Sequence, residues 1–157
     1  MTNRVVFDCM VFLQGAASLD GPAATCLRLA ETGLVELFLS SAVLDEVHDV
    51  LTRPKLRKQF SALTDETVSA FLTRVSHFAR LVRDVPKAVG LPRDRKDQKY
   101  LDLAVAVRAT YLVSRDADLL DLMQGQSVEA RSFRTNFSYI TILDPVSFLR
   151  ALAGQTP

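Results

Sequence analysis

Residues 97–116, which read DQKYLDLAVAVRATYLVSRD, have the pattern of a helix followed by a short strand. The first twelve of these residues are apolar on most sides of a helix, so we expect this helix to be buried. Residues 111–113 form an apolar run typical of a short buried strand. A further helix is expected from about Asp116 to Met123. The stretch therefore predicts a helix–strand–helix unit of an α/β domain.

The rest of the chain continues this alternation on both sides. Short apolar runs predict strands at residues 5–7, 35–39 and 140–143, and residues 81–85 are a further candidate strand. Apolar periodicity and capping residues predict helices at residues 22–32, 41–51, 65–82 and 145–152. We expect loops after Asp8 and at residues 85–95 and 124–138. Strands that alternate with helices predict a three-layer α/β/α fold with a parallel sheet.

Composition describes one ordinary domain without a strong charge bias. The chain has 157 residues, of which 48% are hydrophobic and 24% are charged, and its formal net charge is +1. A nucleic-acid partner must therefore be recognised by a local patch, because no whole-molecule basic field exists. Two cysteines and two histidines at unrelated positions predict neither a zinc site nor a disulfide framework. The sequence shows no signal peptide and no membrane span, so we expect a cytoplasmic protein without a membrane partner.

Four acids are predicted to lie at one end of the sheet. Asp8 follows the first strand and Asp116 follows the strand at residues 111–113, so both belong at the carboxyl edge, where such sheets gather their chemistry. Asp97 begins the buried helix, where negative charge is favoured. Glu46 borders the apolar stripe of its helix, whereas Asp45 points away from that stripe. Glu46 therefore faces inward and needs a partner.

Carboxylates that converge repel one another, and a divalent cation among them relieves the repulsion. An all-oxygen site without His or Cys favours a hard cation, so we expect Mg²⁺ or Mn²⁺. Such an ion can orient a phosphate and neutralise a leaving oxygen. Each acid taken alone is equally well interpreted as a turn or helix-capping residue. Asp94 and Asp118 can likewise be either site acids or loop and helix-capping residues, and Asp118 is a further candidate metal ligand.

Three segments resemble the PIN-domain family, and the resemblance extends over the whole chain. Residues 5–9 (VVFDC) are similar to the family's opening strand and first acid, and residues 40–47 (SSAVLDEV) to the helix that bears its glutamate. Residues 93–104 (RDRKDQKYLDLA) together with residues 111–120 (YLVSRDADLL) resemble its long closing signature. The likeness is in particular to PIN proteins assigned as toxins of bacterial toxin–antitoxin systems.

This resemblance implies a PIN-like nuclease domain over residues 1–153 with a C-terminal tail at residues 154–157. It implies a Mg²⁺- or Mn²⁺-dependent endoribonuclease that hydrolyses single-stranded RNA, a protein antitoxin as partner and a homodimer. The family's catalytic and metal-binding acids correspond here to Asp8, Glu46, Asp97 and Asp116. One position departs from the family, which usually has a polar side chain two residues after the first acid. This chain has Met10 there, and a thioether is only a weak hydrogen-bond acceptor.

Basic residues near the acids are candidates for contacts with the RNA backbone. Each of them is equally well interpreted as an ordinary solvated residue of the surface. They are Arg93, Arg95, Lys96, Lys99 and Arg115, with Arg131 and Arg134 in the expected late loop.

Three other functions compete with the nuclease. A catalytically impaired PIN-fold module for RNA binding or protein interaction fits the departure at Met10. An aspartyl-phosphate enzyme commonly has a second acid at that position, and this chain lacks it. A dinucleotide-binding domain needs a glycine-rich turn after the first strand, and none is present.

Overall fold

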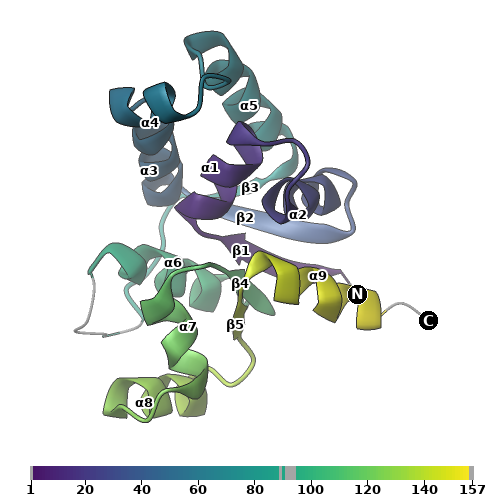
Figure 1. Cartoon of the computed structure of the whole chain (residues 1–157). Helices are drawn as coiled ribbons and strands as arrows, with labels where there is room; N and C mark the ends of the chain where they lie inside the picture. Colours follow the sequence, from purple (N-terminus) through teal and green to yellow (C-terminus); the bar gives the residue numbers. More distant parts are fainter. Residues whose placement is uncertain (1, 89, 91–94, 156–157) are drawn as a thin grey trace.

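The computed structural model describes residues 2–88, 90 and 95–155, with the side chain of Arg95 excepted. Within these residues one sheet of five parallel strands has the order β3-β2-β1-β4-β5. The strands are β1 (Asn3–Phe7), β2 (Val35–Ser40), β3 (Arg80–Val82), β4 (Tyr111–Val113) and β5 (Thr141–Leu143). Helices flank this sheet (Figure 1). The predicted α/β fold with a parallel sheet is confirmed.

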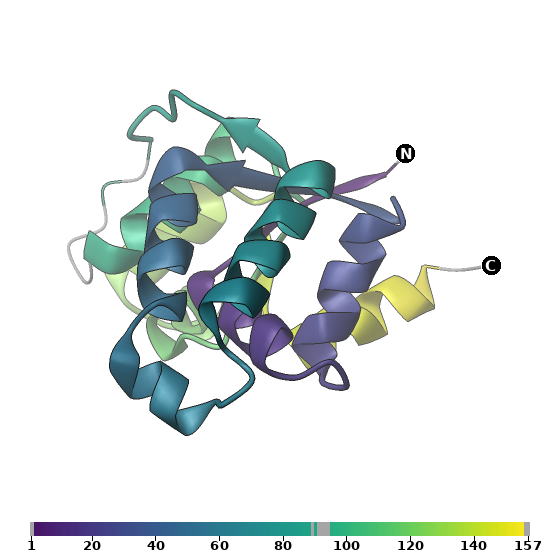
Figure 2. The ribbon, with the colours of Figure 1, turned by 90° about the horizontal axis from the view of Figure 1, so that it is seen from above.

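Nine helices connect and follow the strands in the described part of the chain. They are α1 (Cys9–Ala17), α2 (Pro22–Glu31), α3 (Ser41–Leu51), α4 (Pro54–Gln59), α5 (Asp65–Phe78), α6 (Arg95–Ala106), α7 (Ala117–Gln124), α8 (Val128–Asn136) and α9 (Pro145–Gly154). Figures 1 and 2 show α1, α2, α3 and α5 on one face of the sheet and α6 on the other. None of these helices is long and apolar enough to cross a membrane.

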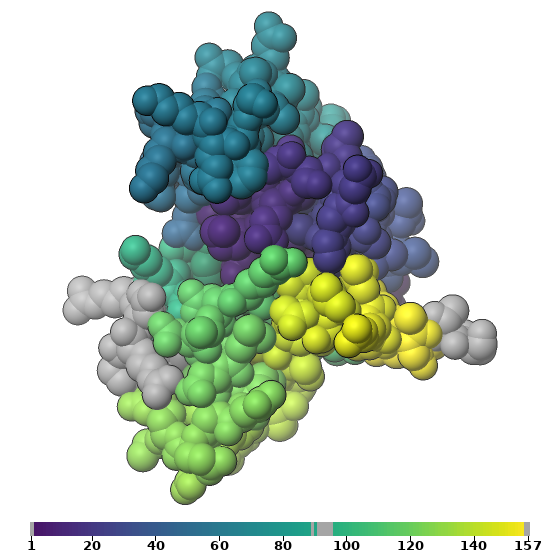
Figure 3. Space-filling view, in the orientation of Figure 1, coloured from purple at the N-terminus to yellow at the C-terminus, as the bar shows by residue number. Residues whose placement is uncertain are grey.

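The strand order changes direction between β1 and β4. The chain steps outward from β1 to β2 and β3, and then returns to place β4 and β5 on the other side of β1. Parallel crossovers are right-handed, so stepping in opposite directions puts the connecting helices on opposite faces. In Figure 3 most of the early part of the chain (purple to teal) fills the upper half of the view, and most of the late part (green and yellow) fills the lower half. Open α/β sheets bind ligands at the carboxyl ends of the strands at such a reversal.

The hydrophobic core is centred on β1. Val5, Val6 and Phe7 are fully buried, as expected for a central strand that is covered on both faces. The ring of Phe7 lies 6.1 Å from that of Phe12 in α1 and 6.0 Å from that of Phe148 in α9. This packing fixes the position of the residue that follows β1, which is Asp8.

The segment after Asp8, expected as a loop, is the helix α1. Its buried residues include the consecutive Val11, Phe12 and Leu13, so the helix shows no clear polar side. Gly15 also lowers the helix propensity of the segment. A Cβ at this glycine would lie 2.3 Å from Cδ1 of Leu27, so the glycine permits the close approach of α1 to α2.

Two other helices were not predicted, and one predicted helix is shorter than expected. The expected loop at residues 124–138 contains α8, which begins after the capping residue Ser127 and buries only Ala130 and Phe133. The short helix α4 begins at Pro54, which was expected only to end α3. The helix expected at residues 65–82 ends at Phe78. The alternative strand in this region is confirmed as β3, which covers Arg80–Val82 and not residues 81–85.

Candidate metal and active site

Asp8 joins the end of β1 to the beginning of α1. Its backbone N–H donates to the carbonyl of Val113 at 3.1 Å and extends the sheet by one residue. Its Oδ1 accepts from the N–H of Val11 at 3.2 Å and caps α1, and its Oδ2 accepts from the hydroxyl of Ser114. The pKa of Asp8 is raised to about 6, chiefly because the carboxyl is buried. The hydrogen bonds from Ser114 and Val11 oppose this increase, and the negative charge of Asp116 contributes to it.

Ser114 links the ends of β1 and β4. It is fully buried, donates to Asp8, and accepts from the N–H of Asp116 at 2.9 Å. Asp116 in turn caps α7, because its Oδ1 accepts from the N–H groups of Asp118 at 2.8 Å and Leu119 at 3.3 Å. Ser114 was not among the predicted site residues, since a serine between a strand and a helix is common and carries no signal of its own.

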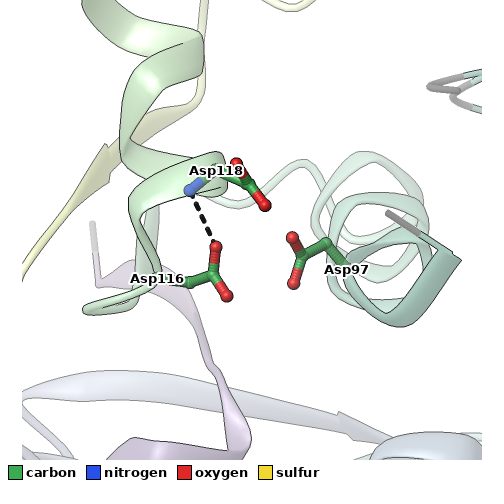
Figure 4. Close-up of side chains that lie close together, drawn as sticks. All are labelled: Asp97, Asp116 and Asp118. Carbon is green, nitrogen blue, oxygen red and sulfur yellow. Dashed lines mark hydrogen bonds between the residues drawn. The ribbon is translucent and has the colours of Figure 1, made fainter. Parts of the chain in front are cut away.

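Asp97, Asp116 and Asp118 form an acidic group. One carboxylate oxygen of each lies within 4.8 Å of those of the other two. Figure 4 shows the three side chains pointing toward one another, from the first turn of α6 and the beginning of α7. Two oxygens on opposite sides of a Mg²⁺ ion lie about 4.2 Å apart. A small inward shift would therefore let all three aspartates reach one ion, and their hard oxygen donors suit Mg²⁺ or Mn²⁺.

The other two predicted acids lie outside this group of three aspartates. Asp8 is connected to Asp116 through the hydroxyl of Ser114. Glu46, on α3, is bound to residues of α6. The structure thus brings Asp97, Asp116 and the further candidate Asp118 together, with Asp8 one hydrogen-bonded residue away.

Glu46 is half-buried and has two partners from α6, whereas Asp45 is exposed. One carboxylate oxygen of Glu46 lies 2.8 Å from the Nζ of Lys99, and the other accepts from the hydroxyl of Tyr100. The ammonium of Lys99 also lies 5.4 Å from the centre of the Tyr100 ring. These contacts supply the partner that an inward-facing glutamate requires.

The hydroxyl of Tyr100 also accepts from the backbone N–H of Cys9 at 3.1 Å. Burial, followed by the hydrogen bond to Glu46, raises the pKa of Tyr100 well above its ordinary value, so the phenol stays protonated. Burial and the nearby charges of Glu46 and Asp8 raise the pKa of the Cys9 thiol to about 12, which excludes a thiolate nucleophile at neutral pH. Sequence reasoning missed Tyr100, because an aromatic residue in a buried helix is ordinarily a core residue.

The basic residues predicted to hold RNA have different surroundings. Lys96 and Arg115 are exposed beside the acids, and Lys99 is bound to Glu46. Arg93 lies outside the described residues, and the side chain of Arg95 is not described.

The two arginines of the expected late loop also differ from each other. Arg134 donates to the carbonyls of Leu122 at 2.9 Å and Gly125 at 2.8 Å, and thereby satisfies the carboxyl end of α7. Arg131 is exposed and donates to the side chain of Gln126 at 3.0 Å. Arg134 is thus held in the fold, and Arg131 is the more accessible of the two.

These features define a parallel α/β domain with carboxylates at the reversal of its strand order. The family model of the PIN domain matches residues 4–118, which extend from β1 to the beginning of α7 and contain every acid described above. The chain belongs to the PIN domain family. PIN domains are generally nucleases and typically use divalent metal ions. No curated protein matches the chain.

Proposed function

We propose that this protein is a Mg²⁺- or Mn²⁺-dependent endoribonuclease that hydrolyses phosphodiester bonds of single-stranded RNA. The observation that carries the proposal is the convergence of Asp97, Asp116 and Asp118 within 4.8 Å, in a chain of a family whose members are generally nucleases. These three aspartates would hold the ion, with Asp8 and Glu46 beside them. When bound, the ion would supply the positive charge that orients the scissile phosphate and neutralises the leaving oxygen.

The chain's own residues prepare this site in two ways. Ser114 fixes the carboxylate of Asp8 and the backbone of Asp116 relative to each other, so it joins the ends of β1 and β4. The exposed side chains of Lys96 and Arg115 add positive charge next to the acids, which can attract the RNA backbone without reading its sequence.

The surface next to Asp116 supports a single-stranded substrate. An open hollow there is lined by Arg115, Leu120, Asp144 and Val146. Leu120 and Val146 offer apolar surface to an unstacked base, and Arg115 offers a cation to its phosphate. Bases become available for such contacts where RNA is not paired.

We further infer that the protein is the toxin of a toxin–antitoxin pair, acts in the cytoplasm as a homodimer and is neutralised by a protein antitoxin. This inference rests on the likeness of three sequence segments to PIN toxins. Co-expression supplies its test, because the toxin should arrest growth unless its antitoxin is made with it.

A catalytically impaired RNA-binding or interaction module is the second candidate. Two observations favour it: Met10 stands where the family usually has a polar residue, and the carboxylate of Glu46 is already bound to Lys99 and Tyr100. One experiment separates the two functions. Labelled single-stranded and duplex RNA are incubated with the protein in Mg²⁺, Mn²⁺ or EDTA, with Asp116→Asn as the control. Metal-dependent cleavage that the variant lacks supports the nuclease, and binding without cleavage in any metal supports the module.

A further inference from the structure

We propose that Tyr100 is a positioning residue of the nuclease, whose hydroxyl holds Glu46 in place relative to the aspartates. The proposal rests on the function proposed above. It concerns a residue that is not among the acids predicted from the sequence.

The hydroxyl of Tyr100 has one partner as donor and another as acceptor. Its hydrogen is donated to Glu46, and its oxygen accepts from the N–H of Cys9 at 3.1 Å. Cys9 is the first residue of α1 and directly follows Asp8. Tyr100 lies one turn after Asp97 on α6, so the two side chains leave the same face of that helix. A single hydroxyl therefore connects the three helices that begin at Asp8 or carry Glu46 and Asp97.

Glu46 needs such a connection because its side chain is flexible. Its side chain is 26% exposed, so packing alone leaves it room to move, and ordering a glutamate costs rotamer entropy. Lys99 neutralises its charge, but an ammonium on a long stem is a point charge without a preferred direction. Tyr100 is 3% exposed, so its ring is held by its surroundings. In this arrangement Lys99 neutralises the carboxylate of Glu46, and Tyr100 fixes its orientation.

Tyr100→Phe removes the hydroxyl and keeps the buried ring. Glu46 would keep its contact with Lys99 but would lose the hydrogen bond that joins it, through the hydroxyl of Tyr100, to Cys9 of α1. We expect kcat to fall about ten- to a hundredfold, as is usual when a group that orients a metal-site residue is lost, and Mn²⁺ to bind about tenfold more weakly. KM for RNA should change little, because Tyr100 is buried away from the substrate.

Tyr111→Phe is the matched control. Tyr111 is also buried, at 7% exposure, and its hydroxyl also has a partner, the Nε2 of Gln155 at 2.6 Å. It begins β4 and so lies at the opposite edge of the sheet from the acids. The control loses a buried hydroxyl without touching Glu46, and it should keep the Mn²⁺ affinity and kcat of the wild type.

A double-mutant cycle with Glu46→Gln tests whether Tyr100 acts through Glu46. If it does, Tyr100→Phe lowers kcat far less in the Glu46→Gln background than in the wild type. If Tyr100 only stabilises the fold, the two losses add. Calorimetric titration with Mn²⁺ provides a readout that does not depend on turnover.

Three results would overturn the proposal: wild-type kcat and Mn²⁺ affinity in folded Tyr100→Phe, equal losses in Tyr111→Phe, or additive losses with Glu46→Gln. If Tyr100→Phe does not fold, Glu46→Asp replaces it, because this change leaves the tyrosine in place and only withdraws the carboxylate. It should then lower kcat and Mn²⁺ affinity, and wild-type values would refute the proposal. A wild-type protein that neither binds Mn²⁺ nor cleaves RNA would refute the proposed function itself, and the positioning role with it.

Discussion

At the residue scale, the carboxyl of Asp8 couples protonation to folding. Burial raises its pKa from 3.8 to about 6, so the folded protein binds this proton more tightly than the unfolded chain does. Without metal, this difference in pKa contributes up to about 3 kcal/mol to the free energy of unfolding. The contribution is fully present below pH 4 and is lost as the pH rises through 6. We expect Asp8→Asn to unfold at higher urea than the wild type at pH 8 in EDTA, with most of the difference gone at pH 4. RNA cleavage should be abolished.

This prediction has an internal check, because asparagine caps a helix about as well as aspartate. The bond from Val11 is therefore retained, and any stabilisation reports the lost charge. Asp45→Asn, at an exposed position on α3, is the control and should show no such pH dependence. Strong destabilisation of Asp8→Asn with cleavage intact would instead make Asp8 a helix cap and nothing more.

Met10 is the second residue that a single substitution can test. Its side chain is 44% exposed, so Met10→Asn buries no amide, and the free energy of unfolding should stay within about 0.5 kcal/mol. We expect kcat for RNA cleavage to rise about tenfold, since the change restores a short polar group near Asp8. Leu19→Asn, at a position that is 71% exposed, is the control for a general gain in solubility. A folded variant without higher kcat would show that Met10 does not limit the site.

The sequence indicates some of these residues and conceals others for a physical reason. Glu46 stands out because a charged residue beside an apolar stripe is anomalous on its own helix. Tyr100 and Ser114 are ordinary in their own elements. Their partners Cys9 and Asp8 lie 91 and 106 positions away in the sequence. No local pattern reports a contact of that range.

At the scale of elements, the helices with a clear apolar period were predicted, and so was the largely buried α6, whereas α1, α4 and α8 were not. Helix α5 has exposed and buried sides and a capping residue, Thr64, so its periodicity is clear. Helix α1 is buried on most sides, and α8 is short with few buried residues, so neither gives the 3.6-residue pattern. The missed helix α8 also explains why Arg134 was interpreted as a loop residue.

Arg134 yields a prediction that belongs to α7 and α8 together. Arg134→Met removes two hydrogen bonds to carbonyls at the end of α7 and should lower the free energy of unfolding by about 1–3 kcal/mol. RNA affinity and its salt dependence should not change. Arg131→Met, three residues earlier and exposed, should change stability by less than about 0.5 kcal/mol. Denaturant unfolding and RNA binding at several salt concentrations test both variants. Weaker RNA binding by folded Arg134→Met would contradict this structural role.

At the scale of the whole molecule, alternation of strands and helices predicts a parallel sheet but not the order of its strands. The order β3-β2-β1-β4-β5 makes β1 and β4 neighbours and sets their carboxyl ends side by side. Asp8 and Asp116 are near each other for this reason. Asp97 joins the group because α6 crosses back from β3 to β4. The sequence therefore predicts which edge of the sheet is acidic, and the topology determines which acids meet there.

Repulsion among these acids predicts how the whole protein responds to metal. A cation that binds only the folded state stabilises it by about 2.7 kcal/mol at a concentration of one hundred times its Kd. For a domain of this size, that raises Tm by roughly 5–10 °C. We expect Mn²⁺ or Mg²⁺ to produce this increase over EDTA in calorimetric melting. Zn²⁺ should not match it, because it prefers Cys and His ligands and the three aspartates offer neither. Asp97→Asn should reduce the Mn²⁺ effect while raising Tm in EDTA, since it removes one ligand and one repelling charge. An unchanged Tm from EDTA to millimolar Mn²⁺ would eliminate the metal site, and with it the explanation for why three aspartates are held together at this edge.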